Sequence, residues 1–75
     1  MRIKKLGNNE TLMVYNDGTE ILFSYETPVA GRTHNGYFRT DKNFSVTTSR
    51  HINKYLEGRN ATIVDQQSIE ELVKC

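Results

Sequence analysis

The stretch that decides the fold is residues 11–25, which read TLMVYNDGTEILFSY. Two runs rich in apolar, β-branched and aromatic side chains, Thr11–Tyr15 and Thr19–Tyr25, flank the polar triplet 16–18. An Asp-Gly pair between such runs is a strong hairpin signal, because the tight turn needs positive φ angles that glycine adopts freely. The sequence therefore predicts two antiparallel strands joined at Asp17-Gly18.

Alternation along these strands predicts which side chains share a face of the sheet. We expect one face to carry Ile21, Phe23 and Tyr25, matched by Leu12 and Val14. Met13 and Leu22 are then expected on the opposite face, partly covered by a helix.

Further strands are predicted on both sides of this hairpin. Val29–Thr33 and Tyr37–Thr40 form a second hairpin whose turn contains Asn35-Gly36, and Arg2–Leu6 is an additional leading strand. The sole proline, Pro28, lies between two candidate strands. We expect it at a bend or an edge position, since proline cannot donate a hydrogen bond to a ladder.

Residues 44–58, FSVTTSRHINKYLEG, predict the first helix. Thr47 or Thr48 is expected as its N-cap, where a hydroxyl accepts a hydrogen bond from an unpaired amide of the first turn. Gly58 is expected to end it in the left-handed conformation. The helical spacing of the remaining apolar residues predicts a buried stripe made of Ile52, Tyr55 and Leu56.

The end of the chain predicts a short strand, Ala61–Val64, and a last helix capped by Asp65. The residues of that helix expected in the core are Ile69, Leu72 and Val73. The fold class is therefore α+β: a small antiparallel sheet of four to six strands packed against one or two short helices. The order is (β)ββββαβα, and residues 1–75 form one domain.

Size and composition bound the function. With 75 residues, 36% of them hydrophobic, the chain is too small to enclose a deep substrate cleft, so we expect no enzyme. The only cysteine is Cys75, which we interpret as a solvated thiol. Neither His34 nor His51 has a second ligand at a metal-binding spacing, and no phosphate loop is present, so we predict no metal and no cofactor. The apparent lack of a signal peptide or membrane-spanning run predicts a cytoplasmic protein.

The net charge of +1 hides a strong segregation along the chain. Residues 6–27 hold four acidic and no basic residues, whereas residues 28–59 hold six basic and two acidic ones. A cationic segment between acidic flanks can steer an anionic partner towards the protein. The competing interpretation is that opposite blocks pair within the fold, as adjacent strands often do.

The cationic segment supplies the candidate site, because Arg50 and Lys54 lie one turn apart on the predicted helix and His51 lies beside them. Arg39 and Lys42 precede this helix closely enough to extend the surface. Such a surface can bind an acidic protein, or a phosphate backbone where basic side chains displace counterions. A solvated helix face is the plainer alternative. The predicted partner-binding residues are Arg39, Lys42, Arg50, His51 and Lys54.

Residues 17–30 and the segments 40–42 and 45–56 resemble a family of small uncharacterised proteins of bacteriophages and prophages. The resemblance covers most of the chain and transfers no catalytic or binding residue. It implies a phage accessory protein that acts in the cytoplasm of the bacterial host and binds a host or defence protein complex as an inhibitor. The alternative is a small nucleic-acid-binding module that uses the same basic face. A homodimer is compatible with either.

Overall fold

The computed structural model describes residues 2–74, so Cys75 lies outside the described part of the chain. Eight elements follow one another, in the order β1 (Arg2–Gly7), β2 (Glu10–Val14), β3 (Glu20–Ser24), β4 (Thr27–Thr33), β5 (Gly36–Thr40), α1 (Val46–Leu56), β6 (Ala61–Val64) and α2 (Gln66–Lys74). This confirms the predicted α+β class and the predicted order of elements.

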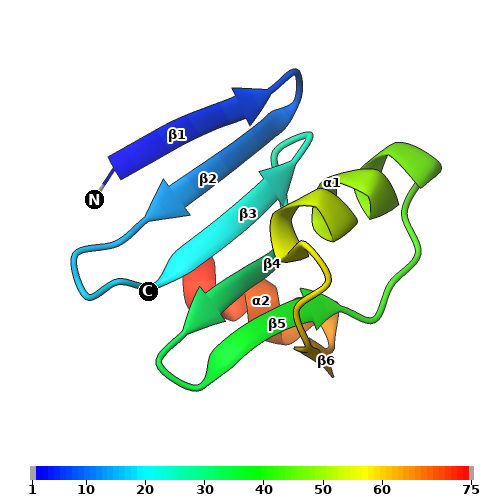
Figure 1. Cartoon of the computed structure of the whole chain (residues 1–75). Coiled ribbons are helices and arrows are strands. Elements are labelled where there is room, and N and C mark those ends of the chain that lie inside the picture. Colours follow the sequence, from blue (N-terminus) through cyan, green and yellow to red (C-terminus); the bar gives the residue numbers. More distant parts are fainter. Residues whose placement is uncertain (1, 75) are drawn as a thin grey trace.

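The six strands form one sheet in sequence order, β1 to β6. The first five are antiparallel neighbours, whereas β6 pairs parallel to β5 because α1 carries the chain across the sheet between them. Figure 1 shows α1 in front of the sheet and α2 behind it. The sheet therefore has a helix on each face, and we call these the α1 face and the α2 face.

Each face has its own small core. On the α1 face, the buried residues are Leu12, Leu22, Val29, Ala30, Ile52 and Leu56. On the α2 face, they are Ile21, Phe38 and Ile69. The apolar stripe predicted for α1 is confirmed at Ile52 and Leu56, while Tyr55 is only partly buried against the same cluster.

The predicted faces of the first hairpin are wrong. Leu12 pairs with Leu22 and Met13 pairs with Ile21, so Leu12 lies with Leu22 and not with Ile21. The reason is a three-residue loop, 16–18, closed by hydrogen bonds from the Tyr15 amide to the Thr19 carbonyl (2.8 Å) and from the Gly18 amide to the Tyr15 carbonyl (3.0 Å). One residue more than a two-residue turn shifts the register and exchanges the faces of a whole strand.

The N-cap of α1 is Ser45 and not Thr47 or Thr48. The Ser45 backbone is extended (φ −129°, ψ 168°), and its hydroxyl accepts a hydrogen bond from the Thr48 amide at 3.1 Å. Both candidates are already inside the helix, and Thr48 is buried against the sheet. Gly58 has the expected positive φ of 81°, but the left-handed conformation begins one residue earlier, at Glu57.

Pro28 lies inside β4 and not between strands, which corrects the predicted bend. The sheet accepts it at a bulge: Leu22 pairs with Ala30 and Phe23 pairs with Pro28, so Val29 is the extra residue. Pairing with β5 begins only at Ala30, so the missing amide of Pro28 interrupts no ladder on that side.

The last strand and helix largely follow the prediction. β6 spans Ala61–Val64 as expected, and α2 begins directly after Asp65, whose carboxylate accepts a hydrogen bond from the Ser68 hydroxyl. Ile69 is fully buried, but Leu72 is 45% exposed, so its predicted core position is wrong.

Candidate partner-binding surface

The three partner-binding residues predicted on α1 have different surroundings. Arg50 is exposed, and it makes no ion pair with any residue in the range 2–74. His51 is partly buried, with Nδ1 2.8 Å from the Ser24 Oγ. Lys54 is largely exposed, yet its Nζ lies 3.6 Å from the Glu10 Oε1. Of the three, only Arg50 has no side-chain hydrogen bond or ion pair to the sheet among residues 2–74.

His51 belongs to a cluster of hydroxyl groups at the interface between α1 and β3. The Ser24 Oγ lies 3.0 Å from the Thr48 Oγ1 as well as near His51, and both hydroxyl residues are buried. A hydroxyl beside an imidazole is also how some enzymes activate a nucleophile. Here the serine is only 2% exposed and shared with Thr48, so we interpret the cluster as the polar seam that seats α1 on the sheet.

Glu10 is a buried carboxylate, 3% exposed, at the start of β2. Lys54 is the ion-pair partner of Glu10. The Oε2 atom of Glu10 has no hydrogen-bond partner among the described residues. Burying a carboxylate is unfavourable unless an opposite charge compensates it. Lys54 therefore has a structural role in addition to any role in binding.

Arg39 and Lys42 lie in two different hollows. Arg39, on β5, borders a hollow of about 390 Å³ together with Asn53 of α1 and Arg59 of the following loop. Lys42 borders a separate hollow whose other charged members are acidic: Asp41, Asp65 and Glu70. The fold thus brings Arg39 towards α1 and places Lys42 near the start of α2.

The register of the sheet adds two basic residues that the sequence analysis did not place. Arg2 pairs with Val14 and Lys4 pairs with Leu12, and directly paired residues share a face. Because Leu12 and Val14 pack beneath α1, both basic side chains belong to the α1 face. Within residues 2–74 neither makes an ion pair, and both are exposed. A basic leading strand was visible in the sequence, but its face depended on the register.

Two ion pairs join the oppositely charged blocks of the chain among the described residues. Arg32 contacts Glu20 at 3.4 Å and Lys54 contacts Glu10 at 3.6 Å. Each joins the cationic segment 28–59 to the acidic segment 6–27, as the competing interpretation of the charge blocks predicted. Arg39, Lys42, Arg50 and Arg59 of the same segment have no such partner in residues 2–74.

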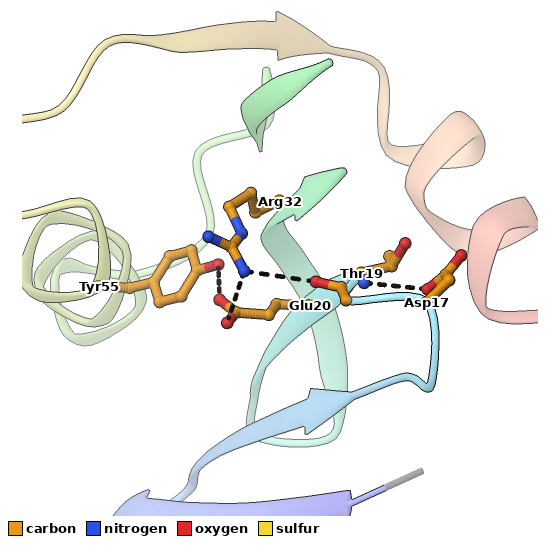
Figure 2. Close-up of polar contacts among 6 residues, drawn as sticks. Asp17, Thr19, Glu20, Arg32 and Tyr55 are labelled. Carbon is orange, nitrogen blue, oxygen red and sulfur yellow. Dashed lines mark hydrogen bonds and ion pairs between the residues drawn. The ribbon is translucent and has the colours of Figure 1, made fainter. Parts of the chain in front are cut away.

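The Glu20 carboxylate is the centre of a network that joins three elements (Figure 2). The Tyr55 hydroxyl, from α1, donates to the Glu20 Oε1 at 2.8 Å, and Arg32, from β4, contacts the Oε2. Burial first, and then the hydrogen bond to Glu20, raise the pKa of the Tyr55 hydroxyl well above its ordinary value. No local sequence pattern predicts this network, because its members lie on three separate elements.

We expect this network to make stability fall in alkaline solution. Above about pH 10 an unfolded tyrosine loses its proton, whereas folded Tyr55 keeps it, so the free energy of unfolding decreases as the pH rises. Urea unfolding at about pH 8 and about pH 11 should show a smaller decrease for Tyr55→Phe than for the wild type. Tyr25→Phe, at a half-exposed position, is the control. Its free energy of unfolding should decrease between the two pH values as much as that of the wild type. An equal decrease in the free energy of unfolding in all three proteins would contradict the prediction.

The described residues form neither a metal-binding cluster nor a membrane-spanning helix. Within residues 2–74, no three His, Cys, Asp or Glu side chains lie together as metal ligands would. Neither described helix has the length and apolar character needed to cross a membrane.

Comparison with known proteins gives one match. No curated protein and no solved structure matches the chain. A family profile matches residues 1–71, which includes every strand and most of α2. The chain therefore belongs to DUF8033, a family of unknown function.

Proposed function

We propose that this protein is a non-enzymatic binding protein that recognises an acidic surface of a partner protein through the α1 face. The binding surface consists of Arg50 and Lys54 on α1 and Arg2 and Lys4 on β1, and we call it the cationic face. The observation that carries the proposal is that Arg2, Lys4 and Arg50 are exposed on one side of the sheet without an ion-pair partner in residues 2–74.

The position of Lys54 connects the two parts of this face. Lys54 contacts Glu10 of β2. In the sheet, β2 lies between β1 and β3, and β3 is a strand on which α1 packs. The Lys54 ammonium group therefore extends from the helix towards the strand that carries Lys4. Clustered charges of one sign raise the rate of association with an oppositely charged partner and select for it.

The aromatic residues favour a protein partner over a nucleic acid. Binding of single strands uses exposed aromatic rings on which bases stack. Phe38 is only 6% exposed, and the Tyr37 ring is occupied by Tyr55 (centroids 5.8 Å apart) and by the Arg59 guanidinium. Of the aromatics between positions 37 and 44, only Phe44 remains 44% exposed.

The resemblance to small bacteriophage proteins suggests where to search for the partner. In this proposal the protein acts in the bacterial cytoplasm as an inhibitor, and its target is a host or defence protein complex with an acidic surface. Arg39 pairs with Ala30 and so also lies on the α1 face, but it borders the hollow next to β6, and Lys42 borders the acidic hollow. Neither residue is included in the cationic face.

The test is capture of partners from host lysate by wild-type protein and by the Lys4→Glu/Arg50→Glu variant, with nuclease present, followed by mass spectrometry. We expect a captured protein to bind the variant at least about tenfold more weakly, because two favourable charge contacts become repulsive. Lys42→Glu is the control, since it makes one charge reversal of the same kind in the separate acidic hollow and should bind like the wild type. Equal binding by all three proteins would refute the proposal.

The nucleic-acid alternative is checked in parallel with short DNA and RNA. Phosphate binding weakens steeply as salt rises from roughly 50 to 200 mM. Tight binding at low salt that falls steeply in this range, and that Lys4→Glu/Arg50→Glu removes, would support the nucleic-acid function instead.

A further inference from the structure

The α2 face of the sheet is only partly covered by α2. Ile69 of α2 packs against Ile21 and Phe38, but the face continues beyond them over β2 and β1. There the register places Ile3 beside Met13, and Ile3 is 66% exposed. This uncovered region forms a shallow hollow of about 430 Å³, whose walls include Ile3, Met13, Phe23 and Tyr25 with Lys5 and Glu26.

The hollow carries one positive and one negative side chain beside its apolar residues. Lys5 and Glu26 both border it, and within residues 2–74 neither makes an ion pair. A two-fold interface requires a patch that complements itself. In such an arrangement Lys5 of one copy can face Glu26 of the other, and the apolar side chains of both copies meet between them.

The turn between β3 and β4 gives an independent reason to assign a contact to this region. Tyr25 and Glu26 have φ angles of 55° and 78°, in the left-handed region that Asn and Gly adopt with little strain. A bulky aromatic and a glutamate at these positions are unfavourable for the turn itself. The Tyr25 ring contacts His51 of α1 within the chain (centroids 6.1 Å apart), whereas Glu26 has no ion-pair partner in residues 2–74. Because backbone strain of this kind is typically kept where a side chain serves a function, the strain at Glu26 points to a contact outside the chain.

The open edge of β1 is a poorer place for a second copy. Arg2, Lys4 and Lys5 all lie on this strand, so antiparallel pairing of two β1 strands would bring like charges together. The hollow on the α2 face lacks this repulsion, because the two charged residues that border it, Lys5 and Glu26, are opposite in sign.

We propose that two copies of this chain form a symmetric dimer through the uncovered part of the α2 face, with Lys5 of each copy paired with Glu26 of the other. A chain of 75 residues has a small core, and association adds buried apolar area that it lacks alone. This inference goes beyond the proposed function, because it concerns the opposite side of the sheet from the cationic face.

The first test is sedimentation velocity over micromolar to millimolar protein concentration. The wild type is expected to pass from monomer to dimer in this range, and Ile3→Asp should raise the dimer Kd at least about tenfold by placing a charge in the apolar contact. Ile63→Asp is the matched control, because Ile63 is also 66% exposed but lies on β6 at the other edge of the sheet. A wild type that stays monomeric throughout, or equal effects of the two substitutions, would overturn the proposal.

The second test is a charge exchange that identifies the paired residues. Lys5→Glu and Glu26→Lys should each weaken the dimer by bringing like charges together, and the double variant should restore it. Glu26→Gly separates association from folding: glycine relieves the positive φ, so the monomer should melt no lower than the wild type while the dimer weakens. Failure of the double variant to restore association would refute the Lys5–Glu26 pairing, and with it the proposed geometry.

Discussion

Gly31→Ala is expected to lower the free energy of unfolding by about 3 kcal/mol, a large fraction of the total stability of so small a domain. Gly31 is a buried residue in the middle of β4, and it pairs with Ile21 on one side and Phe38 on the other. A methyl group at its Cα would lie 2.2 Å from the Glu20 carbonyl oxygen and 2.6 Å from the Phe38 Cζ. Neither group can yield cheaply, because the first is backbone of the neighbouring strand and the second is a core ring.

The consequence extends to α2. Phe38 packs with Ile21 and Ile69, so a displaced ring loosens the contact between the sheet and the helix. Urea unfolding followed by circular dichroism measures the loss directly. In a chain of this size each kcal/mol corresponds to about 4–8 °C in Tm, so thermal melting should show the change clearly.

Gly58→Ala is the control for this prediction. Gly58 has no atom within 4 Å of the added methyl group, so its only cost arises from its φ of 81°. We expect a loss of about 1 kcal/mol there, since alanine adopts the left-handed conformation with difficulty. Equal losses at the two glycines would show that the crowding at Gly31 relaxes easily, contrary to our argument.

Lys54→Glu is expected to lower the free energy of unfolding by about 2 kcal/mol, although Lys54 lies on the outside of α1. The substitution removes the cation that lies 3.6 Å from the Glu10 Oε1 and places a second carboxylate beside it. Glu10 is buried, so water screens this repulsion less than at an open surface. The exposure of Lys54 itself limits the effect, which is why we expect less than for a fully buried pair.

Arg50→Glu is the control, because it makes the same change one helical turn away without a carboxylate partner in the described residues. It should alter stability by no more than about 0.5 kcal/mol. The double variant Lys54→Glu/Glu10→Gln should recover most of the loss, since the glutamine removes the buried charge. If Glu10→Gln recovers nothing, the two residues are not coupled and the structural role of Lys54 is wrong.

These two predictions affect how the candidate site is tested. A loss of binding in a Lys54 variant mixes reduced stability with a lost contact, whereas Arg50 and Lys4 report on contact alone. From the sequence alone the five candidate residues are equivalent, because residue type and spacing do not show what lies beneath each side chain. The buried partner of Lys54 comes from β2, more than 40 residues earlier in the chain.

Local patterns were sufficient for most of the elements. The Asp17-Gly18 pair, the alternation around it, the helical stripe at Ile52 and Leu56 and the cap at Asp65 each indicate one element through interactions between near neighbours. Local patterns were not sufficient where several neighbouring residues could fill the same role. Ser45, Thr47 and Thr48 can all cap a helix, and only the packing of Thr48 against Ser24 shows which one does.

The sequence by itself determined the class, the order of elements and the number of basic residues, because these follow from periodicity, turn chemistry and composition. The tertiary structure alone decided which residues share a face. One additional loop residue at positions 16–18 set the register of the first hairpin and thereby placed Leu12 with Leu22. The register between β1 and β2 then places Arg2 and Lys4 on the α1 face. It places Ile3 and Met13 on the uncovered part of the α2 face. Faces depend on pairing between strands, and pairing is a property of the assembled sheet.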